Sequence, residues 1–267
     1  MNNVNKTLYI PLYGKAFVSK RGIILKDKSA ETIWEKEGFS LRGKSKSKWL
    51  SYYMAMRSRV YDEWVACQIK KDPSAVVLHI GCGMDSRILR VDAKSNLWYD
   101  VDFPEVIEER RKYFSESDLY HMCSFDMRQD GWKKEIRSAS HAIIILEGVS
   151  MYFEKEELTS LLSGLSEHFK SVSILMDCYT EKAARISKYK NPINDVGVTK
   201  VFGYDDPSAL AERSGICFTA EHNMTPMEYI EELSGAEKAI FKRLFAGKIS
   251  RAMYRMYEFE KTGEPSL

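Results

Sequence analysis

The sequence has few cysteines, scattered histidines and no long apolar run, and each shortage excludes a class of protein. The five cysteines are odd in number and lie far apart, so neither a disulfide framework nor the Cys-x-x-Cys spacing of a zinc site is predicted. The five histidines show no metal-ligand spacing either, and we expect no bound metal. No segment reaches the apolar length that spans a bilayer. We therefore expect reduced thiols in a cytoplasmic protein without a membrane partner.

Charge of one sign is also lacking. The chain of 267 residues has 40 basic and 38 acidic side chains, a net charge of +2, and 44% hydrophobic residues. This composition favours one large globular domain, or one domain with an appended cap, and argues against disorder and against a nucleic-acid partner. The first residues have no basic stretch followed by an apolar one, so no signal peptide is predicted. A short basic run, Arg42 to Lys48, is interpreted as a solvated turn before a helix.

The pattern changes near Pro73. Before it, a helix is predicted from about Lys48 to Lys70, because apolar residues recur there every three or four positions, at Trp49, Tyr53, Met56, Val60 and Trp64. After it, strands alternate with helices. The strands are predicted at Ala75–Ile80, Asn96–Asp102, Tyr120–Asp126, His141–Val149 and Ser171–Tyr179. This alternation indicates an α/β protein with a doubly wound parallel sheet and right-handed crossovers.

The last third is less regular. The segment at about residues 181–215 is rich in loop residues and aromatics, and we interpret it as a lid or insertion. Tyr189, Phe202 and Tyr204 are expected either to shape an aromatic-tolerant pocket or to pack over the sheet. Two late segments, Cys217–Asn223 and Ser250–Glu260, are predicted to be strands that add to the parallel sheet in the antiparallel direction.

Ligands of open parallel sheets bind beyond the carboxyl ends of the strands. The predicted strands end there at a glycine loop and at four carboxylates, namely Gly81 with Gly83, then Asp102, Asp126, Glu147 and Asp177. Four carboxylates that converge on one edge repel one another unless hydrogen-bond donors or positive charge lie among them. The sequence therefore predicts a ligand site at this edge.

The glycine loop lacks the third glycine of the dinucleotide signature. That glycine brings a helix close beneath a pyrophosphate, whereas this loop continues with Asp85, which would add negative charge beside one. A ligand with adenosine, positive charge and no phosphate fits better, and S-adenosylmethionine meets this description. Asp102 lies about twenty residues past the loop, where an acid binds ribose hydroxyls. Asp100 is the competing residue, and we interpret it as an exposed carboxylate.

Four blocks of the sequence resemble the leucine carboxyl methyltransferase family, within it the group related to polyketide-synthesis O-methyltransferases. The blocks are "RSRVYDEWV" (57–65), "VVLHIGCGMDSRILRV" (76–91), "WYDVDFPEVIEERR" (98–111) and "ILEGVSMYFEKEEL" (145–158). The resemblance implies a class I methyltransferase fold, that is, a Rossmann-like seven-stranded sheet. It also implies an N-terminal helical cap (1–73) and an S-adenosylmethionine-binding domain (74–267).

The resemblance also implies roles for single residues. Arg59 would pair with the methionyl carboxylate of S-adenosylmethionine, and Glu147 would lie near its ammonium group. The remaining assignments are Gly81 and Gly83 along the methionine and sulfonium, Asp102 on the ribose, Asp126 and Met127 at the adenine, and Tyr152 facing the methyl acceptor as the candidate catalytic residue. Each has a plainer interpretation: Arg59 as a surface arginine, Glu147 as a solvated strand end, Tyr152 as packing. Arg87 is predicted to be a structural partner of a neighbouring carboxylate.

These observations predict an S-adenosylmethionine-dependent O-methyltransferase that acts on a small-molecule carboxylate, phenol or enol. A carboxylate is already ionised at neutral pH and needs no general base, whereas a phenol or alcohol does, and the sequence shows no outstanding base. Three alternatives stay open: an NAD(P)-dependent oxidoreductase, a protein carboxyl methyltransferase, and a non-catalytic protein that retains the cofactor site. The sequence does not indicate the acceptor or the oligomeric state.

Overall fold

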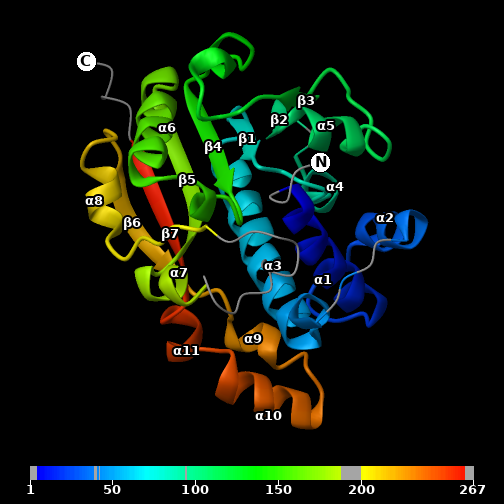
Figure 1. Ribbon diagram of the computed structural model, residues 1–267. Coiled ribbons are helices and arrows are strands. Elements are labelled where there is room, and N and C mark those ends of the chain that lie inside the picture. Colours follow the sequence, from blue (N-terminus) through cyan, green and yellow to red (C-terminus); the bar gives the residue numbers. More distant parts are fainter. Residues whose placement is uncertain (1–4, 39–40, 42, 94, 188–199, 262–267) are drawn as a thin grey trace.

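The computed structural model describes residues 5–38, 41, 43–93, 95–187 and 200–261. Its centre is a seven-stranded sheet with the order β3-β2-β1-β4-β5-β7-β6 (Figure 1). The strands are β1 Val76–Ile80, β2 Trp98–Asp102, β3 Tyr120–Ser124, β4 His141–Leu146, β5 Ser171–Tyr179, β6 Cys217–His222 and β7 Tyr254–Lys261. The first five are parallel, and β7 runs antiparallel to both β5 and β6. The expected doubly wound sheet and the two late strands are therefore confirmed, but β7 alone runs antiparallel to the first five strands, and β6 runs in their direction.

The central strand β1 shows why the apolar runs form buried parallel strands. All five of its residues are buried, as are four of the five residues of β2 and five of the six residues of β4. Successive side chains point to opposite faces of the sheet. Val77 accordingly belongs to one hydrophobic cluster, while Leu78 and Ile80 belong to the other. Both faces of the sheet must therefore be covered by helices.

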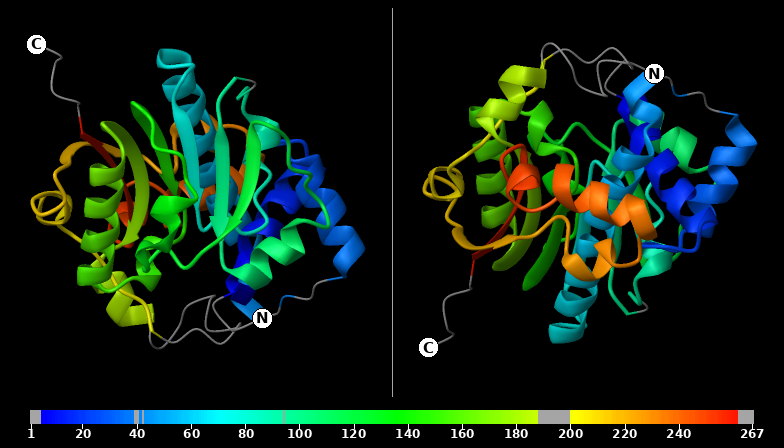
Figure 2. Two further views of the ribbon diagram at one scale, coloured as in Figure 1. Left: turned by 90° about the horizontal axis from the view of Figure 1, so that it is seen from above. Right: turned by 90° about the horizontal axis from the view of Figure 1, so that it is seen from below.

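The helices form one layer on each side of the sheet (Figure 2). Helices α1 and α3 lie on one face, in a cluster with Val77 and Ile143, and α6 and α8 lie on the other, with Leu78 and Ile144. The α-helices are α1 Tyr9–Lys20, α2 Lys28–Glu37, α3 Lys48–Lys71, α4 Arg87–Arg90, α5 Pro104–Arg110, α6 Lys155–His168, α7 Glu181–Ser187, α8 Pro207–Ala211, α9 Met227–Ile230, α10 Gly235–Leu244 and α11 Lys248–Arg251. Short 3-10 turns lie at η1 Asn5–Leu8, η2 Gly43–Lys46, η3 Asp130–Lys134 and η4 Ser150–Tyr152.

The long helix predicted from the apolar stripe is α3, which ends one residue later than expected. Its buried side chains share one hydrophobic cluster with α1, α2 and a face of the sheet. The expected boundary of the cap at residue 73 falls in the turn between α3 and β1. The N-terminal helices thus complete the core of the sheet.

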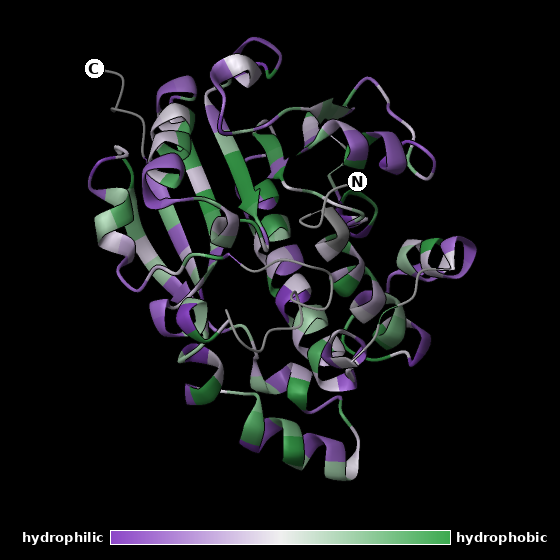
Figure 3. Ribbon diagram, in the orientation of Figure 1, coloured by the Kyte–Doolittle hydropathy of each residue, from purple (hydrophilic) through white to green (hydrophobic). Residues whose placement is uncertain are grey.

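The segment between β6 and β7, for which the sequence predicted no element, forms the three helices α9, α10 and α11. These lie together beyond one end of the sheet, near the start of α3 (Figure 1). The hydropathy colouring shows apolar strands in the interior and mixed colours on α10 (Figure 3). Within the described ranges, the helices are too short or too polar to cross a membrane. The lid residue Tyr189 lies outside the described residues.

Candidate active site

A cavity of about 820 Å³ opens at the carboxyl ends of the parallel strands. Seven of the eight predicted site residues line it: Gly81, Gly83, Asp102, Asp126, Met127, Glu147 and Tyr152. They come from the ends of β1, β2, β3 and β4, which the parallel topology brings to a common edge. Arg59, the eighth, is not among the lining residues.

The glycine loop after β1 is shaped by contacts that only glycine permits. Gly81 has a φ of +67°, and a Cβ placed there would lie 2.3 Å from Cγ2 of Val149. Gly83 has a φ of +51°, and its N–H donates to Oδ2 of Asp102 at 2.8 Å. The backbone at both positions is left-handed, which glycine adopts without steric cost. The loop therefore presents bare backbone to the cavity.

Asp102 has acceptor capacity to spare. Its carboxylate accepts the backbone N–H groups of Gly83 and Phe103, each at 2.8 Å, and a carboxylate offers about four lone-pair sites. Burial raises the pKa of Asp102 to about 6, although those two N–H groups and Arg110 oppose the shift. The described structure therefore places an under-used carboxylate in the cavity wall, as a site for ligand hydroxyls requires.

Asp126 and Met127 extend the same wall beyond β3. The Arg128 guanidinium pairs with Asp126, with Nη2 to Oδ2 at 2.6 Å, and this hydrogen bonding lowers the pKa of the carboxyl. Asp126 is consequently ionised at neutral pH. Phe103 and Phe125 also line the cavity, so apolar surfaces flank the two carboxylates Asp102 and Asp126.

Glu147 and Asp177, at the ends of β4 and β5, share one arginine. Arg57 of α3 donates through Nε to Glu147 and through Nη1 to Asp177, both at 3.0 Å. Arg57 lines the cavity and its side chain is 5% exposed. Gly148 has a φ of +70°, and a Cβ there would come within 3.2 Å of the Arg57 guanidinium. The positive charge that we expected among the carboxylates is thus supplied partly by the protein.

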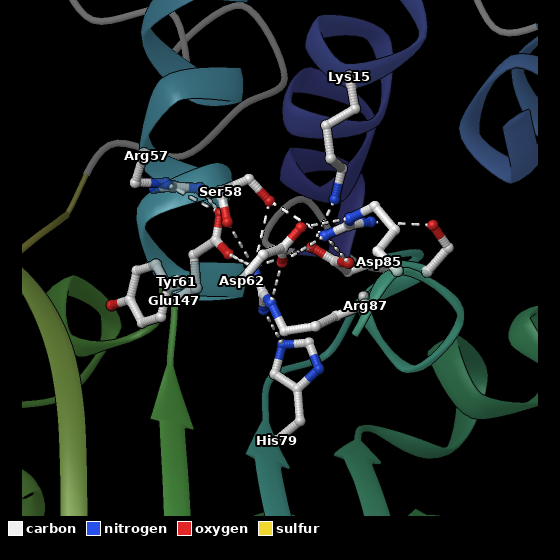
Figure 4. A network of polar contacts seen from close by, with 12 residues as sticks. Lys15, Arg57, Ser58, Tyr61, Asp62, His79, Asp85, Arg87 and Glu147 are labelled. Atoms are coloured by element: carbon white, nitrogen blue, oxygen red, sulfur yellow. Dashed lines mark hydrogen bonds and ion pairs between the residues drawn. The ribbon is translucent and has the colours of Figure 1, made fainter. Parts of the chain in front are cut away.

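A network of buried ion pairs joins the glycine loop to the N-terminal helices (Figure 4). Arg87 contacts both Glu147 and Asp62, as predicted for a structural partner of a carboxylate. Burial alone would raise the pKa of Glu147, but Arg87 and Arg57 lower it to about 2. The Glu147 side chain is therefore buried, ionised and paired with two arginines, and its interpretation as a solvated strand end is wrong.

Asp85 belongs to the same network. Its carboxylate pairs with Lys15 at 2.6 Å and with Arg90 at 2.9 Å, and the side chain is 8% exposed. Burial opposes ionisation, but Arg87, Arg90 and Lys15 hold the pKa of Asp85 well below its usual range. Asp85 was expected to add negative charge beside a pyrophosphate. In the folded chain three cations, Lys15, Arg87 and Arg90, surround its carboxylate, so its charge is largely compensated.

The structure does not bring Arg59 to the cavity. Its Nη1 pairs with Glu232 and donates to the carbonyl oxygen of Ile24 at 3.1 Å. Its guanidinium also lies 4.0 Å from the centre of the Tyr229 ring. Two residues turn about 200° round an α-helix, so Arg57 and Arg59 face different directions. Arg57, and not Arg59, is the α3 arginine that lines the cavity.

Asp100, interpreted as an exposed carboxylate, is fully buried. Its Oδ2 pairs with Arg110 and accepts from the Tyr120 hydroxyl at 2.6 Å, and Trp98 donates to its Oδ1 at 2.8 Å. Burial opposes ionisation, but Arg110 and His79 lower the pKa of Asp100 to about 2. Asp100 therefore stabilises β2 from behind the cavity wall, and Asp102 is the carboxylate that faces the ligand space.

The cavity continues into a part rich in tyrosine and apolar side chains. Its lining residues there are Leu50, Tyr53, Met54, Tyr152, Tyr179, Ile186, Phe202, Leu244, Phe245, Ile249, Met253 and Tyr254. Tyr254 packs edge-on against Tyr179, with ring centres 4.7 Å apart. Phe202 lines this part, whereas Tyr204 is buried and its hydroxyl donates to the carbonyl oxygen of Phe153 at 2.6 Å. Phe202 thus fits the expectation of an aromatic pocket, and Tyr204 fits the expectation of packing over the sheet.

Tyr152 lies in this apolar part, and burial raises the pKa of its phenol. Tyr152 is therefore a neutral donor at physiological pH and not a base. Among the described lining residues the only histidine is His79, which is 2% exposed and lies between Asp100 and Arg87. The described part of the chain likewise shows no group of three or more histidine, cysteine or carboxylate side chains arranged to hold a metal ion.

Sequence reasoning missed Arg57, Arg128 and the whole contribution of α10 and α11. For Arg57 a signal existed, because it stands in the same "RSRVYD" block as Arg59 and on the same predicted helix. The lining residues Leu244, Ile249 and Met253 gave no comparable signal, since they lie in a segment where apolar and basic residues are mixed.

Comparison with known proteins gives three kinds of match. The family model described as leucine carboxyl methyltransferase matches residues 3–166. The tetracenomycin polyketide synthesis O-methyltransferase TcmP of Streptomyces glaucescens is 26% identical over 242 residues, 89% of this chain and 89% of TcmP. The S-adenosyl-L-methionine-dependent methyltransferase dpfgK of Gibberella zeae is 27% identical over 184 residues, 62% of this chain and 61% of dpfgK.

A solved structure shows the fold. Magnesium protoporphyrin IX methyltransferase from Synechocystis, with S-adenosylhomocysteine bound, superposes with a TM-score of 0.51. The two are 11% identical, and the match covers 88% of this chain and 95% of that one. The expected class I methyltransferase fold is confirmed by this likeness together with the order of the seven strands.

Proposed function

The chain belongs to the leucine carboxyl methyltransferase family and is an S-adenosylmethionine-dependent methyltransferase, and from this premise we propose that it methylates an oxygen of a small apolar molecule, in the first place a carboxylate. One observation carries the proposal. The glycine loop, Asp102, Asp126 and Glu147 line one cavity with a tyrosine-rich apolar part, so cofactor and acceptor have adjoining places. Membership of this family favours a methyltransferase over the oxidoreductase alternative.

Within this proposal the residues of the first part bind the cofactor. Asp102 accepts hydrogen bonds from the ribose hydroxyls, for which it has free lone pairs. Asp126 accepts from the adenine amine, and Met127 packs against the ring. Gly81 and Gly83 let the methionine part approach the backbone. S-adenosylmethionine supplies a methyl group on a positively charged sulfur.

Arg57 and Glu147 suit the two charges at the methionyl end. Arg57 presents positive charge to the carboxylate, while the ionised Glu147 attracts the ammonium group. Each already holds the other, at 3.0 Å, so neither needs to reorganise when the zwitterionic ligand binds. Preorganised charges of this kind cost little on binding.

The apolar part suits an acceptor that is already an anion at its reacting oxygen. Methyl transfer requires the acceptor oxygen in line behind the methyl group and the exclusion of water. The described lining residues supply tyrosine hydroxyls that remain protonated, including Tyr152, and so can orient an oxygen but not remove its proton. A carboxylate or an acidic phenol needs no such removal.

The test is methyl transfer from isotopically labelled S-adenosylmethionine to paired acceptors, each an aromatic carboxylic acid with the phenol of the same ring system. Mild base releases methanol from a methyl ester but not from a methyl ether. We expect base-labile product from the acid of at least one pair. Transfer confined to phenols would replace the carboxylate by a hydroxyl as the acceptor. Tight binding of S-adenosylhomocysteine without transfer to any acceptor would favour the non-catalytic alternative.

A further inference from the structure

The exposed side chains of α10, α11 and the residues beside them are both apolar and basic. We call this region the α10–α11 surface and define it by its exposed residues, Ile240, Lys242, Arg243, Leu244, Lys248, Ile249, Arg251 and Met253. Nine large hydrophobic side chains are exposed in the described part of the chain, and four of them lie on this surface. Their exposed fractions are 41% for Ile240, 52% for Leu244, 48% for Ile249 and 37% for Met253. Such a concentration marks an interaction site more often than scattered exposed residues do.

The charge of this surface has one sign. Residues 238–257 contain six lysines and arginines and no acidic residue. Lys238 pairs with Glu231, and Arg251 pairs with Glu221. In the described ranges, no carboxylate lies within ion-pair distance of Lys242, Arg243 or Lys248. Three cations therefore point positive charge toward solvent beside the exposed apolar side chains.

A second basic segment packs beside the first. Lys44 and Lys46 are exposed on η2, in the run that the sequence analysis interpreted as a solvated turn. The α3 helix that follows is tied to α10, since Lys48 pairs with Glu237 at 2.8 Å and the Trp49 ring stacks on Phe245 at 5.5 Å. Two basic segments, about two hundred residues apart in the chain, thus meet at one end of the molecule.

We propose that the α10–α11 surface docks on an anionic lipid bilayer. Apolar side chains that insert at the headgroup level, flanked by lysine and arginine, are the chemistry of peripheral membrane-binding elements. Charge complementarity selects anionic lipid over a neutral apolar partner. The placement is informative, because Leu244, Ile249 and Met253 also line the cavity. Docking would set the cavity mouth against the lipid, where an apolar acceptor is concentrated; this last consequence rests on the proposed function, whereas docking itself does not.

The experiment is co-sedimentation of the full chain with phosphatidylcholine vesicles, with and without phosphatidylglycerol, at low and at high ionic strength. We expect binding to the anionic vesicles that weakens as salt rises, and at least about tenfold weaker binding to phosphatidylcholine alone. The triple variant Lys242→Gln, Arg243→Gln, Lys248→Gln should bind the anionic vesicles about a hundredfold more weakly, since each cation near such a surface is worth about fivefold. Ile240→Ser, which leaves the charges in place, should weaken binding about fivefold.

The matched control removes three charges from the opposite edge of the sheet, with Lys70→Gln, Lys134→Gln and Lys170→Gln, all exposed residues. It should bind vesicles like the unmodified chain. Affinity for S-adenosylhomocysteine is measured on every variant, so loss of the fold is separated from loss of docking. Three results would each overturn the proposal: no binding to anionic vesicles at low salt, equal binding to neutral ones, or equal losses in the two triple variants. None of these three results bears on the cofactor site, which the measurement of affinity for S-adenosylhomocysteine tests separately.

Discussion

Arg57 and Arg59 lie two positions apart on α3 and belong to different parts of the molecule: Arg57 bridges Glu147 and Asp177 in the cavity wall, and Arg59 pairs with Glu232 beside α9. Variants of the two arginines can therefore be compared to separate the effect of a residue in the cavity wall from that of a residue outside it. Both carry the same charge on the same helix, and only one of them reaches the ligand space.

The first prediction uses this pair. Arg57→Lys keeps a positive charge but loses the planar group that holds two carboxylates, so S-adenosylhomocysteine should bind at least about tenfold more weakly. Arg59→Gln should change that affinity less than about threefold and lower stability by about 1 kcal/mol, because its ion pair is partly exposed. Calorimetric titration and thermal unfolding of both variants check this. Equal losses of affinity in the two variants would contradict the assignment of Arg57, rather than Arg59, to the cofactor site.

The second prediction concerns pH. Burial raises the pKa of Asp102 to about 6, and only its ionised form accepts from both ribose hydroxyls. Affinity for S-adenosylhomocysteine should therefore be constant above about pH 7 and fall as the pH drops through 6, by up to about tenfold per unit. Asp102→Asn should bind more weakly at pH 7.5 and show no change between pH 5.5 and 7.5. A native profile that is flat over this range would contradict the assignment.

The third prediction tests the glycine loop. Gly81→Ala places a methyl group 2.3 Å from Val149 in a left-handed conformation, so it should destabilise the fold by about 2 kcal/mol or more and weaken cofactor binding. Gly38 has a similar φ of +60° with nothing within 4 Å, so Gly38→Ala carries only the conformational cost, about 1 kcal/mol. Adding Val149→Ala to Gly81→Ala should restore part of the stability. Thermal unfolding of the three variants measures the steric cost and the conformational cost separately.

The fourth prediction concerns acid stability. Arg110 and His79 lower the pKa of Asp100 from 3.8 to about 2 in the folded chain. A depressed folded pKa contributes stability above the unfolded pKa, and this contribution is lost as the pH falls from about 4 to 2. Asp100→Asn should cost about 3 kcal/mol at pH 7, since it leaves Arg110 buried without its partner, and the difference from the native chain should shrink below pH 4. Denaturant unfolding of the native and variant chains at pH 7 and below pH 4 checks whether the difference in free energy of unfolding shrinks.

The strands could be predicted from the sequence because a strand buried on both faces is a continuous apolar run, which local composition reveals. β1 and β4 are of this kind. The helices α9, α10 and α11 were not predicted, because α9 and α11 have only four residues each and α10 has ten residues, of which only Phe241 is buried. Helices held by a few long-range contacts, such as Trp49 on Phe245, leave little trace in their own sequence.

The residues of the site likewise divide into those that the sequence predicts and those that long-range contacts decide. Of the four carboxylates predicted at the ends of the parallel strands, Asp102, Asp126 and Glu147 line the cavity, whereas Asp177 is buried within β5 and is not among the lining residues. Alternation could not separate Asp100 from Asp102, since both point to the same face of β2. What separates them is the position of Arg110 and Tyr120, which enclose Asp100 and come from other elements. Charge neutralisation of Asp85 by Lys15 is equally a long-range contact, across seventy positions of the chain.

The most direct measurement is a calorimetric titration of the native chain and of Asp102→Ala with S-adenosylhomocysteine and, separately, with NADH. We predict one-to-one binding of S-adenosylhomocysteine by the native chain, binding at least about tenfold weaker by Asp102→Ala in a chain that still unfolds cooperatively, and no heat from NADH. Equal affinities of the native and variant chains for S-adenosylhomocysteine, or saturable binding of NADH, would contradict this prediction.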